Sequence, residues 1–524
     1  MTLPRLALPP SPAVLALLAL AFVAPGLAGH APWKAFDAVA IEVAHEMQRT
    51  GDWLVPRIAG EPWLEDPPLY HWFALAFARA FAWALPFHDA ARLASGACML
   101  AAAGFIYAAG GAAAALALLG SVGLIVHAHE AVPDLLTLAA SCSALFFLSR
   151  KEFPLQSGLG FGISLGVAAL SAGLVVPLAL LLAALVAHLA CDELRTRRAL
   201  PFLAAAIAVA LAIAASWPLV LRQHAAPLFA DWWSAASRTQ GEFAANLRYF
   251  LGIAGWFAWP AWPLALWALW ALRKSWRAPG TFVPAAAALL FLAGAALAGP
   301  PQDINLIPLL APLALLAAQG VGALRRGAAN ALDWFGVTTF TFFTALVWLG
   351  YLAMMTGWPP RVAGNFARLA PGFAPQFQAA PFVFALALAL AWLYLAFFTA
   401  PAPARGLARW AAGVALLWGS FAALWLPWAD HIRSYGGVAR QLRAALPPNA
   451  DCVARESLGD PQRAALSYHA GLRTVATVSK CRYVLVQGGL REEREELGTG
   501  WVRIAEAARP GDGAERYRLY RRPR

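Results

Sequence analysis

The chain has 524 residues, of which 60% are hydrophobic and 13% charged, and its mean hydropathy is +0.59. A soluble protein carries about 25% charged residues, so the composition excludes a soluble class and predicts a polytopic α-helical membrane protein. A membrane barrel is excluded because short segments of alternating hydrophobicity are absent. The net charge of +12 comes from short basic loops and a mixed-charge tail rather than from a basic patch with interleaved aromatics, so we expect no nucleic-acid partner.

Apolar stretches long enough to cross a hydrocarbon core recur along the chain. The first could also be a signal peptide, because Gly26–Gly29 resembles a cleavage site, but we prefer an uncleaved span. We predict thirteen transmembrane helices, near residues 11–29, 91–109, 112–128, 134–149, 156–172, 174–190, 200–221, 247–272, 281–299, 305–320, 331–355, 380–400 and 407–428.

Short basic loops mark the inner side of the membrane. With this rule, the outer segments are residues 31–92, 127–134, 222–246, 300–305 and the tail. If the apolar segment Leu69–Phe87 crossed the membrane, the basic loop at Arg150 would be placed on the outer side, against the positive-inside rule. The segment begins just after Pro67-Pro68 and ends at Pro86, so we predict an interfacial or partly embedded hairpin.

The tail has a different pattern from the rest of the chain. Residues 1–429 are predicted to form the transmembrane module, with the site in outer loop 30–90, and residues 430–524 a small α/β domain on the outer face. We expect strands at 451–455, 473–478, 482–487, 501–507 and 517–521, and helices at 461–470 and 490–497. Cys452 and Cys481 could form a disulfide if the tail is extracytoplasmic.

The most informative segment is Asp37–Trp72, which places acids, histidines and tryptophans beside the first span. Asp37 is either a functional acid at the outer mouth of the bundle or a cap for the helix that follows it. Glu65 and Asp66 form a rigid acidic turn before Pro67-Pro68, or cap the entry to the next helix.

Three further outer segments carry polar side chains. His127–Asp134 has two histidines and two acids, which could bind a divalent cation, although an interfacial loop with Asp134 capping the next helix is the favoured interpretation. Gln302–Asn305 is a second polar cluster. The segment Arg222–Asn246 contains Trp232, Trp233 and Arg238, which form either an aromatic wall with a cation at the site or part of the aromatic belt at the membrane interface.

The run GDWLVPR at residues 51–57, GEP at 60–62 and Glu65-Asp66-Pro67-Pro68-Leu69 resembles the first outer loop of bacterial lipid-A aminoarabinose transferases and related protein O-mannosyltransferases. These are GT-C glycosyltransferases, which use a polyprenyl-phosphate-linked sugar. The resemblance implies thirteen spans, an outer C-terminal domain and an inverting displacement that releases polyprenyl phosphate.

The resemblance also implies roles for single residues. Asp37 would be the catalytic acid beside the acceptor hydroxyl, and Glu65 would match the acid of the family's EKPP turn. Asp134 would match an acid in the second outer loop. Together with the polar residues of the outer segments, this leads us to expect substrate binding by Arg57, Asp66, His71, Asp134, Arg238 and Asn305.

Several cations of the family pattern are missing. Asp37 is followed by Ala38-Val39-Ala40-Ile41 where the family has DE-x-R-Y, and Asp66 replaces the lysine of EKPP. The TKGP and SKLP motifs correspond to Ser171–Leu174 and Pro300–Asn305, again without lysine. A phosphate leaving group needs cationic stabilisation, so either Arg57 and Arg238 supply it, or a divalent cation held by the outer acids does, or activity has been lost.

The sequence therefore predicts an integral inner-membrane glycosyltransferase that transfers a hexose or pentose from a polyprenyl-phosphate carrier to a glycolipid or protein acceptor. The site and the tail would face the periplasm. No cofactor is expected beyond that divalent cation, and no protein metal ligands are assigned. The alternative is a catalytically impaired homologue that binds polyprenyl-phosphate lipids. A transporter is disfavoured because no pair of broken half-spans is evident.

Overall fold

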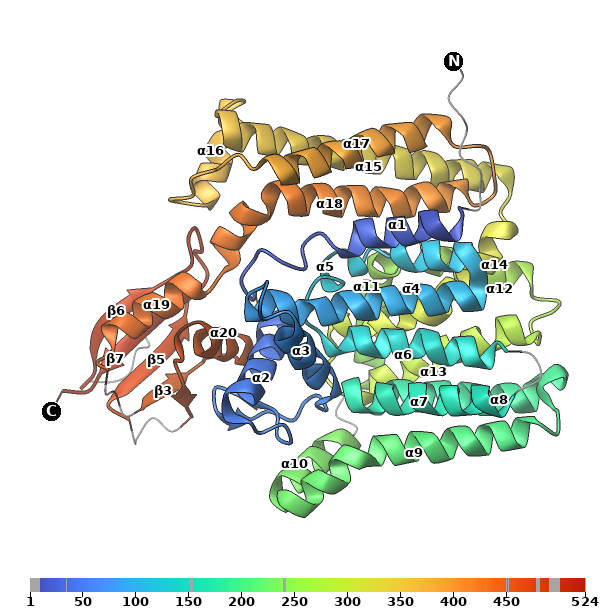
Figure 1. Ribbon diagram of the computed structural model, residues 1–524, viewed down its shortest axis with the longest axis horizontal. Helices are drawn as coiled ribbons and strands as arrows, with labels where there is room; N and C mark the ends of the chain where they lie inside the picture. The colour runs from blue at the N-terminus through green and yellow to red at the C-terminus, as the bar shows by residue number, and fades with distance from the viewer. Residues whose placement is uncertain are drawn as a thin grey trace.

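A computed structural model of the chain describes residues 10–33, 35–150, 154–238, 242–448, 450, 452–476, 481–489 and 500–523. Long helices lie side by side and form a bundle, and a small sheet domain lies beyond one end of it (Figure 1). Helices α2 and α3 lie between the bundle and this domain. The arrangement confirms the predicted class, an α-helical polytopic membrane protein with a C-terminal α/β domain.

In the described part of the chain, eight segments are long and apolar enough to cross a membrane, and four shorter helices are also apolar. The long ones are α4 (Phe87–Leu119), α7 (Leu155–Ala172), α9 (Ala199–His224), α13 (Pro279–Ala298), η2 with α14 (Asp303–Leu309 and Leu310–Gly322), α15 (Arg326–Thr356), α17 (Ala379–Phe398) and α18 with α19 (Arg405–Arg433 and Gly436–Ala445). The short ones are α1 (Pro12–Val23), α6 (Pro133–Leu148), α8 (Val175–Ala190) and α12 (Ala261–Ala271).

Two predicted spans have different boundaries in the structure. The predicted spans near 91–109 and 112–128 meet at Gly111, where φ is +73° and the backbone of α4 is not helical, which agrees with the predicted break. The second of these segments ends at Leu119 and is followed by the short α5 (Leu124–His127). The span near 247–272 is divided into α11 (Phe243–Phe257) and α12, because Pro260 has no N–H to continue the helical hydrogen bonds. The total of thirteen stays a prediction.

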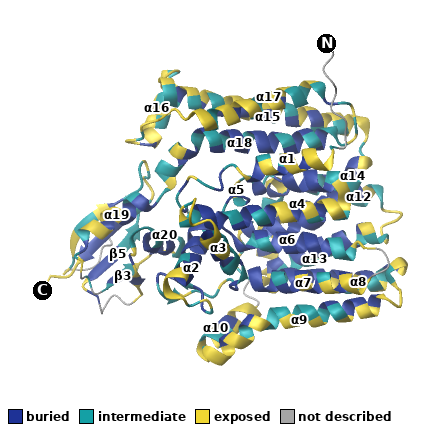
Figure 2. Cartoon of the chain, in the orientation of Figure 1, coloured by how far each residue is buried: buried dark blue, intermediate teal, exposed yellow. Residues whose placement is uncertain are grey.

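Small residues allow the bundle helices to approach closely. On α7, Gly158, Gly162 and Gly166 recur every fourth residue, and a Cβ at Gly162 would lie 2.5 Å from the carbonyl oxygen of Ala206 on α9. Such spacing is typical of membrane helix packing, which depends on close backbone contact because lipid and protein are equally apolar. Buried residues accordingly fill the inside of the bundle, while α9 and α17 expose much of their surface (Figure 2).

The first outer segment forms α2 (Phe36–Thr50), a two-stranded ribbon of β1 (Arg57–Ile58) and β2 (Glu61–Pro62), and α3 (Leu69–Ala80). With 12 residues, α3 is about 18 Å long, shorter than the roughly 30 Å of a hydrocarbon core. Because α1, which is predicted to cross, also has 12 residues, the non-crossing of this segment stays a prediction. The remaining described helices are η1 (Asp192–Leu194), α10 (Ala226–Ser237), α16 (Pro360–Leu369) and α20 (Asp460–Ala470).

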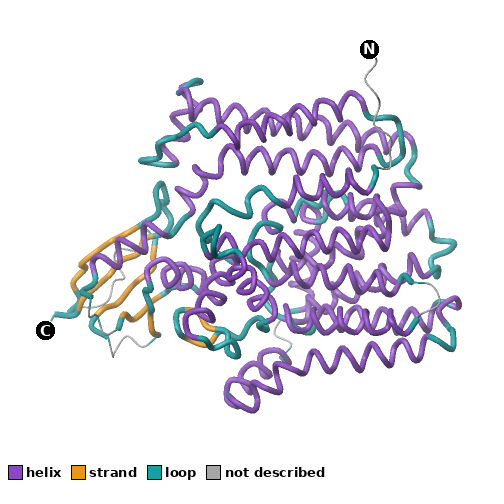
Figure 3. The backbone as a smooth tube through the Cα atoms, viewed as in Figure 1, coloured by secondary structure: helices purple, strands orange, loops and turns teal. Residues whose placement is uncertain are grey.

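The described C-terminal residues form a sheet with strand order β4-β3-β5-β7-β6 (Figure 3). Its strands are β3 (Val453–Glu456), β4 (Thr474–Val475), β5 (Tyr483–Gly488), β6 (Val502–Ala507) and β7 (Arg516–Arg521). β3 runs parallel to β4 and β5, and the other neighbours are antiparallel. All five predicted strands and the helix at 461–470 are present, whereas the predicted helix at 490–497 lies outside the described residues.

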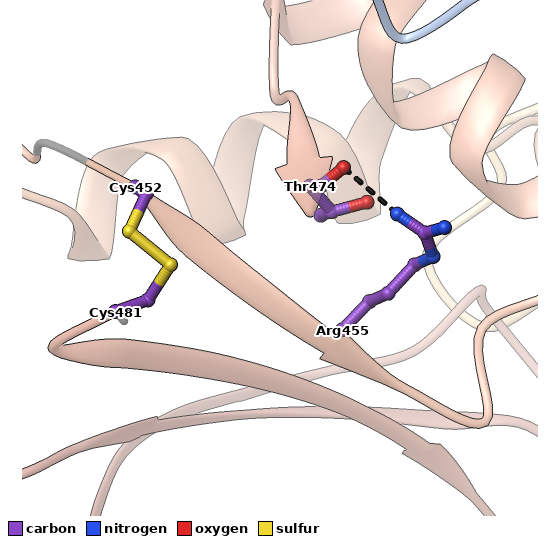
Figure 4. The surroundings of a disulfide bond; sticks show 4 residues. All are labelled: Cys452, Arg455, Thr474 and Cys481. Carbon is purple, nitrogen blue, oxygen red and sulfur yellow. Dashed lines mark hydrogen bonds between the residues drawn. A yellow bond between two sulfur atoms is a disulfide. The ribbon is translucent and has the colours of Figure 1, made fainter. Parts of the chain in front are cut away.

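Cys452 and Cys481 are joined by a disulfide that links the start of β3 to the segment before β5 (Figure 4). In the same region, Arg455 donates a hydrogen bond to the Thr474 carbonyl at 3.0 Å, across the β3–β4 edge. The sequence left open whether these two cysteines are paired, and in the structure they are.

Candidate functional site

Three predicted site acids come together at the end of the bundle that faces the C-terminal domain. Asp66 is half-buried, and burial, the Asp134 carboxylate and the Glu65 carboxylate all raise its pKa well above the ordinary aspartate value. Burial and the charge of Asp460 raise the pKa of Glu65 as well. The acid cluster, Glu65, Asp66 and Asp134, is thus a place where carboxyl groups retain protons more strongly than in water.

The acids reach this position because the backbone around them is fixed. Pro67 and Pro68 precede α3, and Asp134 lies in the first turn of α6 behind Pro133. The Ser171 hydroxyl, at the end of α7, donates to the Pro133 carbonyl at 2.7 Å. Two outer loops and one helix end therefore meet at the acid cluster.

The GDWLVPR segment is held by its own polar groups and by tryptophans. Asp52 Oδ1 accepts from the backbone N–H groups of Leu54 and Val55, at 3.1 and 3.2 Å. The Trp217 indole of α9 donates to the Leu54 carbonyl at 2.8 Å. Arg57, a predicted substrate-binding residue, instead pairs with Asp52 at 3.4 Å.

Asp37 lies apart from the acid cluster, in a buried ion pair. Its side chain is 1% exposed, and Arg92 donates to both carboxylate oxygens, at 2.9 and 2.7 Å. The backbone N–H groups of Ala131 and Trp33 also donate to it, at 2.8 and 3.2 Å. The pKa of Asp37 is lowered because Arg92 outweighs the effect of burial. It is in the first turn of α2 but is not the cap, which is Ala35.

Arg92 is the residue that the sequence reasoning missed. Its side chain is 0% exposed, and it also donates to Asp89 and to the carbonyls of His30 and Ala31. The available signal was an arginine at the start of an apolar span, which needs buried partners. Arg92 joins α4, α2 and the segment after α1.

His127 connects the second and third outer polar segments. Its Nδ1 lies 2.8 Å from Glu130, and its Nε2 lies 3.8 Å from Asp303. Asn305, predicted to bind substrate, accepts from the Gln302 backbone N–H at 3.1 Å and so caps η2. The loops at 127–134 and 300–305 are therefore adjacent, as a shared outer site requires.

Two other predicted residues have contrasting environments. His71 is fully buried, and burial, opposed by a backbone contact with Ala40, lowers its pKa to about 4. The ring is therefore neutral at physiological pH. Arg238 is exposed at the end of α10, where it donates to Ser234.

The C-terminal domain contacts the first outer loop through ion pairs. Glu61 of β2 forms ion pairs with Arg455 at 2.8 Å and with Arg463 at 2.6 Å. Arg463 also forms an ion pair with Asp460 at the start of α20. Arg473 pairs with Glu46 of α2 at 2.8 Å. Because Asp460 raises the pKa of Glu65, this contact extends to the edge of the acid cluster.

The outer acids that could hold a divalent cation do not form a metal site among the described residues. In the described part of the chain, no three histidine, cysteine or acidic side chains converge as metal ligands. Glu65, Asp66 and Asp134 belong to the acid cluster and Glu130 pairs with His127, whose charge also opposes the rise that burial causes in the pKa of Asp134.

No family model and no curated protein match the sequence. The structure is similar to that of ArnT from Cupriavidus metallidurans bound to undecaprenyl phosphate, with a TM-score of 0.67, 19% identity and coverage of 97% of each chain. The apo state of that protein has the same TM-score and 18% identity. The archaeal oligosaccharyltransferase AglB from Archaeoglobus fulgidus matches at a TM-score of 0.47 and 11% identity, over 91% of this chain and 68% of that one.

The chain therefore has the fold of ArnT, a lipid A aminoarabinose transferase of the GT-C class. This confirms the predicted fold class, including the fold that the resemblance of the first outer loop implied.

Proposed function

We propose that the protein is an integral membrane glycosyltransferase that moves a sugar from a polyprenyl-phosphate carrier to a glycolipid or protein acceptor on the periplasmic face. The observation that carries the proposal is the coincidence of an ArnT-like fold over 97% of the chain with an acid cluster at the predicted outer end of the bundle. ArnT is the protein whose structure holds undecaprenyl phosphate.

In the proposed reaction, the acceptor hydroxyl attacks the anomeric carbon while the bond from that carbon to the phosphate oxygen breaks. Polyprenyl phosphate leaves with the bonding electrons, and the hydroxyl proton passes to a carboxylate. A single displacement inverts the anomeric centre. Asp66 is the preferred proton acceptor, because its raised pKa brings it closer to the operating pH of a general base. Glu65, which is exposed beside it, orients the hydroxyl.

Asp37 has a different role in this proposal from the one that the resemblance implied. Both of its oxygens already accept hydrogen bonds from Arg92 and from backbone N–H groups. It acts as a positioning residue that holds α2 against the loop at Ala131, and through that loop fixes Asp134 three residues later.

One observation favours the alternative of an impaired homologue that binds polyprenyl-phosphate lipids. The groups that shift the pKa of Asp66 are all negative or apolar, and Arg57 is already paired with Asp52. The cation that acts on Asp134 is His127, so a departing phosphate would meet an imidazolium there and not one of the family's lysines.

Transfer from radiolabelled polyprenyl-phosphate sugars to a membrane extract separates the two functions. We expect transfer by the wild type and a loss of about 100-fold or more in Asp66→Asn, which is the usual contribution of a general base. Asp37→Asn, assayed where it is still folded, should lose less. If the wild type binds polyprenyl phosphate but transfers no sugar, the impaired-homologue function stands instead.

The periplasmic placement is tested with a reporter fused to the C-terminus. A reporter that is active only in the periplasm should be active, because the odd number of predicted crossings puts the tail outside. Activity of a cytoplasmic reporter alone would reverse the assigned orientation.

A further inference from the structure

A cavity opens at the end of the bundle opposite the acid cluster. It measures about 790 Å³ and lies among the ends of α4, α6, α13 and α14 and the α8–α9 connection. In Figure 1 this is the end farthest from the C-terminal domain. The volume is within the range of about 300–1,000 Å³ that small-molecule sites occupy.

The walls of this cavity are apolar because small residues leave room between the helices. Gly110 and Ala113 of α4 face Leu315 and Ala318 of α14 across it, and Leu148 of α6 closes one side. A Cβ at Gly110 would lie 2.6 Å from Leu315, so α4 and α14 are in close contact at this glycine, beside the cavity. A space lined in this way suits hydrocarbon rather than a soluble polar metabolite.

Among the described residues that line the cavity, one is a cation and one an anion: Arg150 after α6 and Glu193 in η1. Both are exposed, and neither makes an ion pair with a described residue; Arg150 lies over the Phe146 ring at 5.5 Å. The other two polar side chains of the lining already have partners: Gln319 is bonded to Thr281 and to the Gly280 carbonyl, and Ser149 donates to the Phe146 carbonyl. A ligand therefore meets one free positive and one free negative group.

We propose that this cavity binds a zwitterionic aminophospholipid, with the phosphate on Arg150, the ammonium on Glu193 and the start of an acyl chain between α4 and α14. A lipid with a purely anionic head would satisfy Arg150 but would bring its phosphate towards Glu193. A head that carries both charges matches both side chains. The site is separate from the acid cluster and does not depend on glycosyl transfer.

The test is native mass spectrometry of the full chain, extracted from vesicles with equal parts of phosphatidylethanolamine and phosphatidylglycerol. We expect phosphatidylethanolamine to be retained in preference, and Arg150→Glu to lower its occupancy about tenfold, since a charge-assisted contact is lost. Arg273→Glu is the matched control: Arg273 is also on a loop at this end, but lies over Trp270 outside the cavity lining. It should retain the lipid.

Two further variants keep the proposal open to refutation if Arg150→Glu misfolds. Glu193→Gln should lose the preference for phosphatidylethanolamine over phosphatidylglycerol, because only the ammonium partner is removed. Ala113→Trp should fill the cavity and lower retention of both lipids. Equal retention of the two lipids by the wild type, or unchanged retention in Ala113→Trp, would overturn the assignment.

Discussion

Replacing Arg92 by methionine should destabilise the protein more than almost any other single change in the outer segments. The guanidinium is fully buried and donates to Asp37, to Asp89 and to the carbonyls of His30 and Ala31. Methionine fills a similar volume but leaves the Asp37 carboxylate buried without its cation. Removing one partner of such a pair costs about 3–5 kcal/mol.

The assay is thermal unfolding in detergent, followed with a thiol-reactive fluorophore. The chain suits it because its free cysteines are buried and react only on unfolding; they are Cys98, Cys142 and Cys191. Arg49→Met is the control, since Arg49 also pairs with an acid of α2 but its side chain is 47% exposed, and exposed pairs contribute at most about 1 kcal/mol. If both variants unfold at similar temperatures, the structural role assigned to Arg92 is wrong.

Three other outcomes are expected. The rate of transfer should rise with pH through a pKa above the usual aspartate value, and Asp134→Asn should move that rise to lower pH because a charge that raises the pKa of Asp66 is gone; an unmoved pH profile would exclude Asp66 as the titrating group. The pKa of Glu61 is lowered, mainly by the hydrogen bond from Arg455. The stability that Glu61 gives to the contact between the C-terminal domain and the first outer loop is therefore fully present above the ordinary glutamate pKa of about 4.3. It is lost as the pH falls through the lower pKa of the folded state. Limited proteolysis at pH 5 and pH 3.5 should show this loss in the wild type and not in Glu61→Gln. Reducing the Cys452–Cys481 disulfide, whose cysteines are 29 residues apart, should lower the stability of the sheet domain by about 3–4 kcal/mol, and denaturant titrations with and without reductant would detect no difference if the bond is unimportant.

The fold was predictable because its signals are local. Apolar stretches identify bundle helices without knowledge of their neighbours, and alternating residues in the tail identified all five described strands. The limit was local too: Pro260 divides a stretch that hydropathy alone joins, and this break does not change the mean hydropathy. The break at Gly111, by contrast, falls between two predicted spans.

The site was predictable only in part, because charge pairing is a long-range property. The sequence placed Glu65, Asp66 and Asp134 on outer loops, and the structure brings them together. It could not show that Asp37 is saturated by Arg92, which is 55 residues away. The contact of Glu61 with Arg463 spans 402 residues and depends on how the C-terminal domain docks.

The most direct test of the central claim is a balance of products in proteoliposomes supplied with a radiolabelled polyprenyl-phosphate sugar and an acceptor membrane extract. The account predicts that one polyprenyl phosphate is released for each sugar that appears in the acceptor fraction, and that Asp66→Asn abolishes both signals together. Binding of the donor with neither release nor transfer by the folded wild type would contradict it.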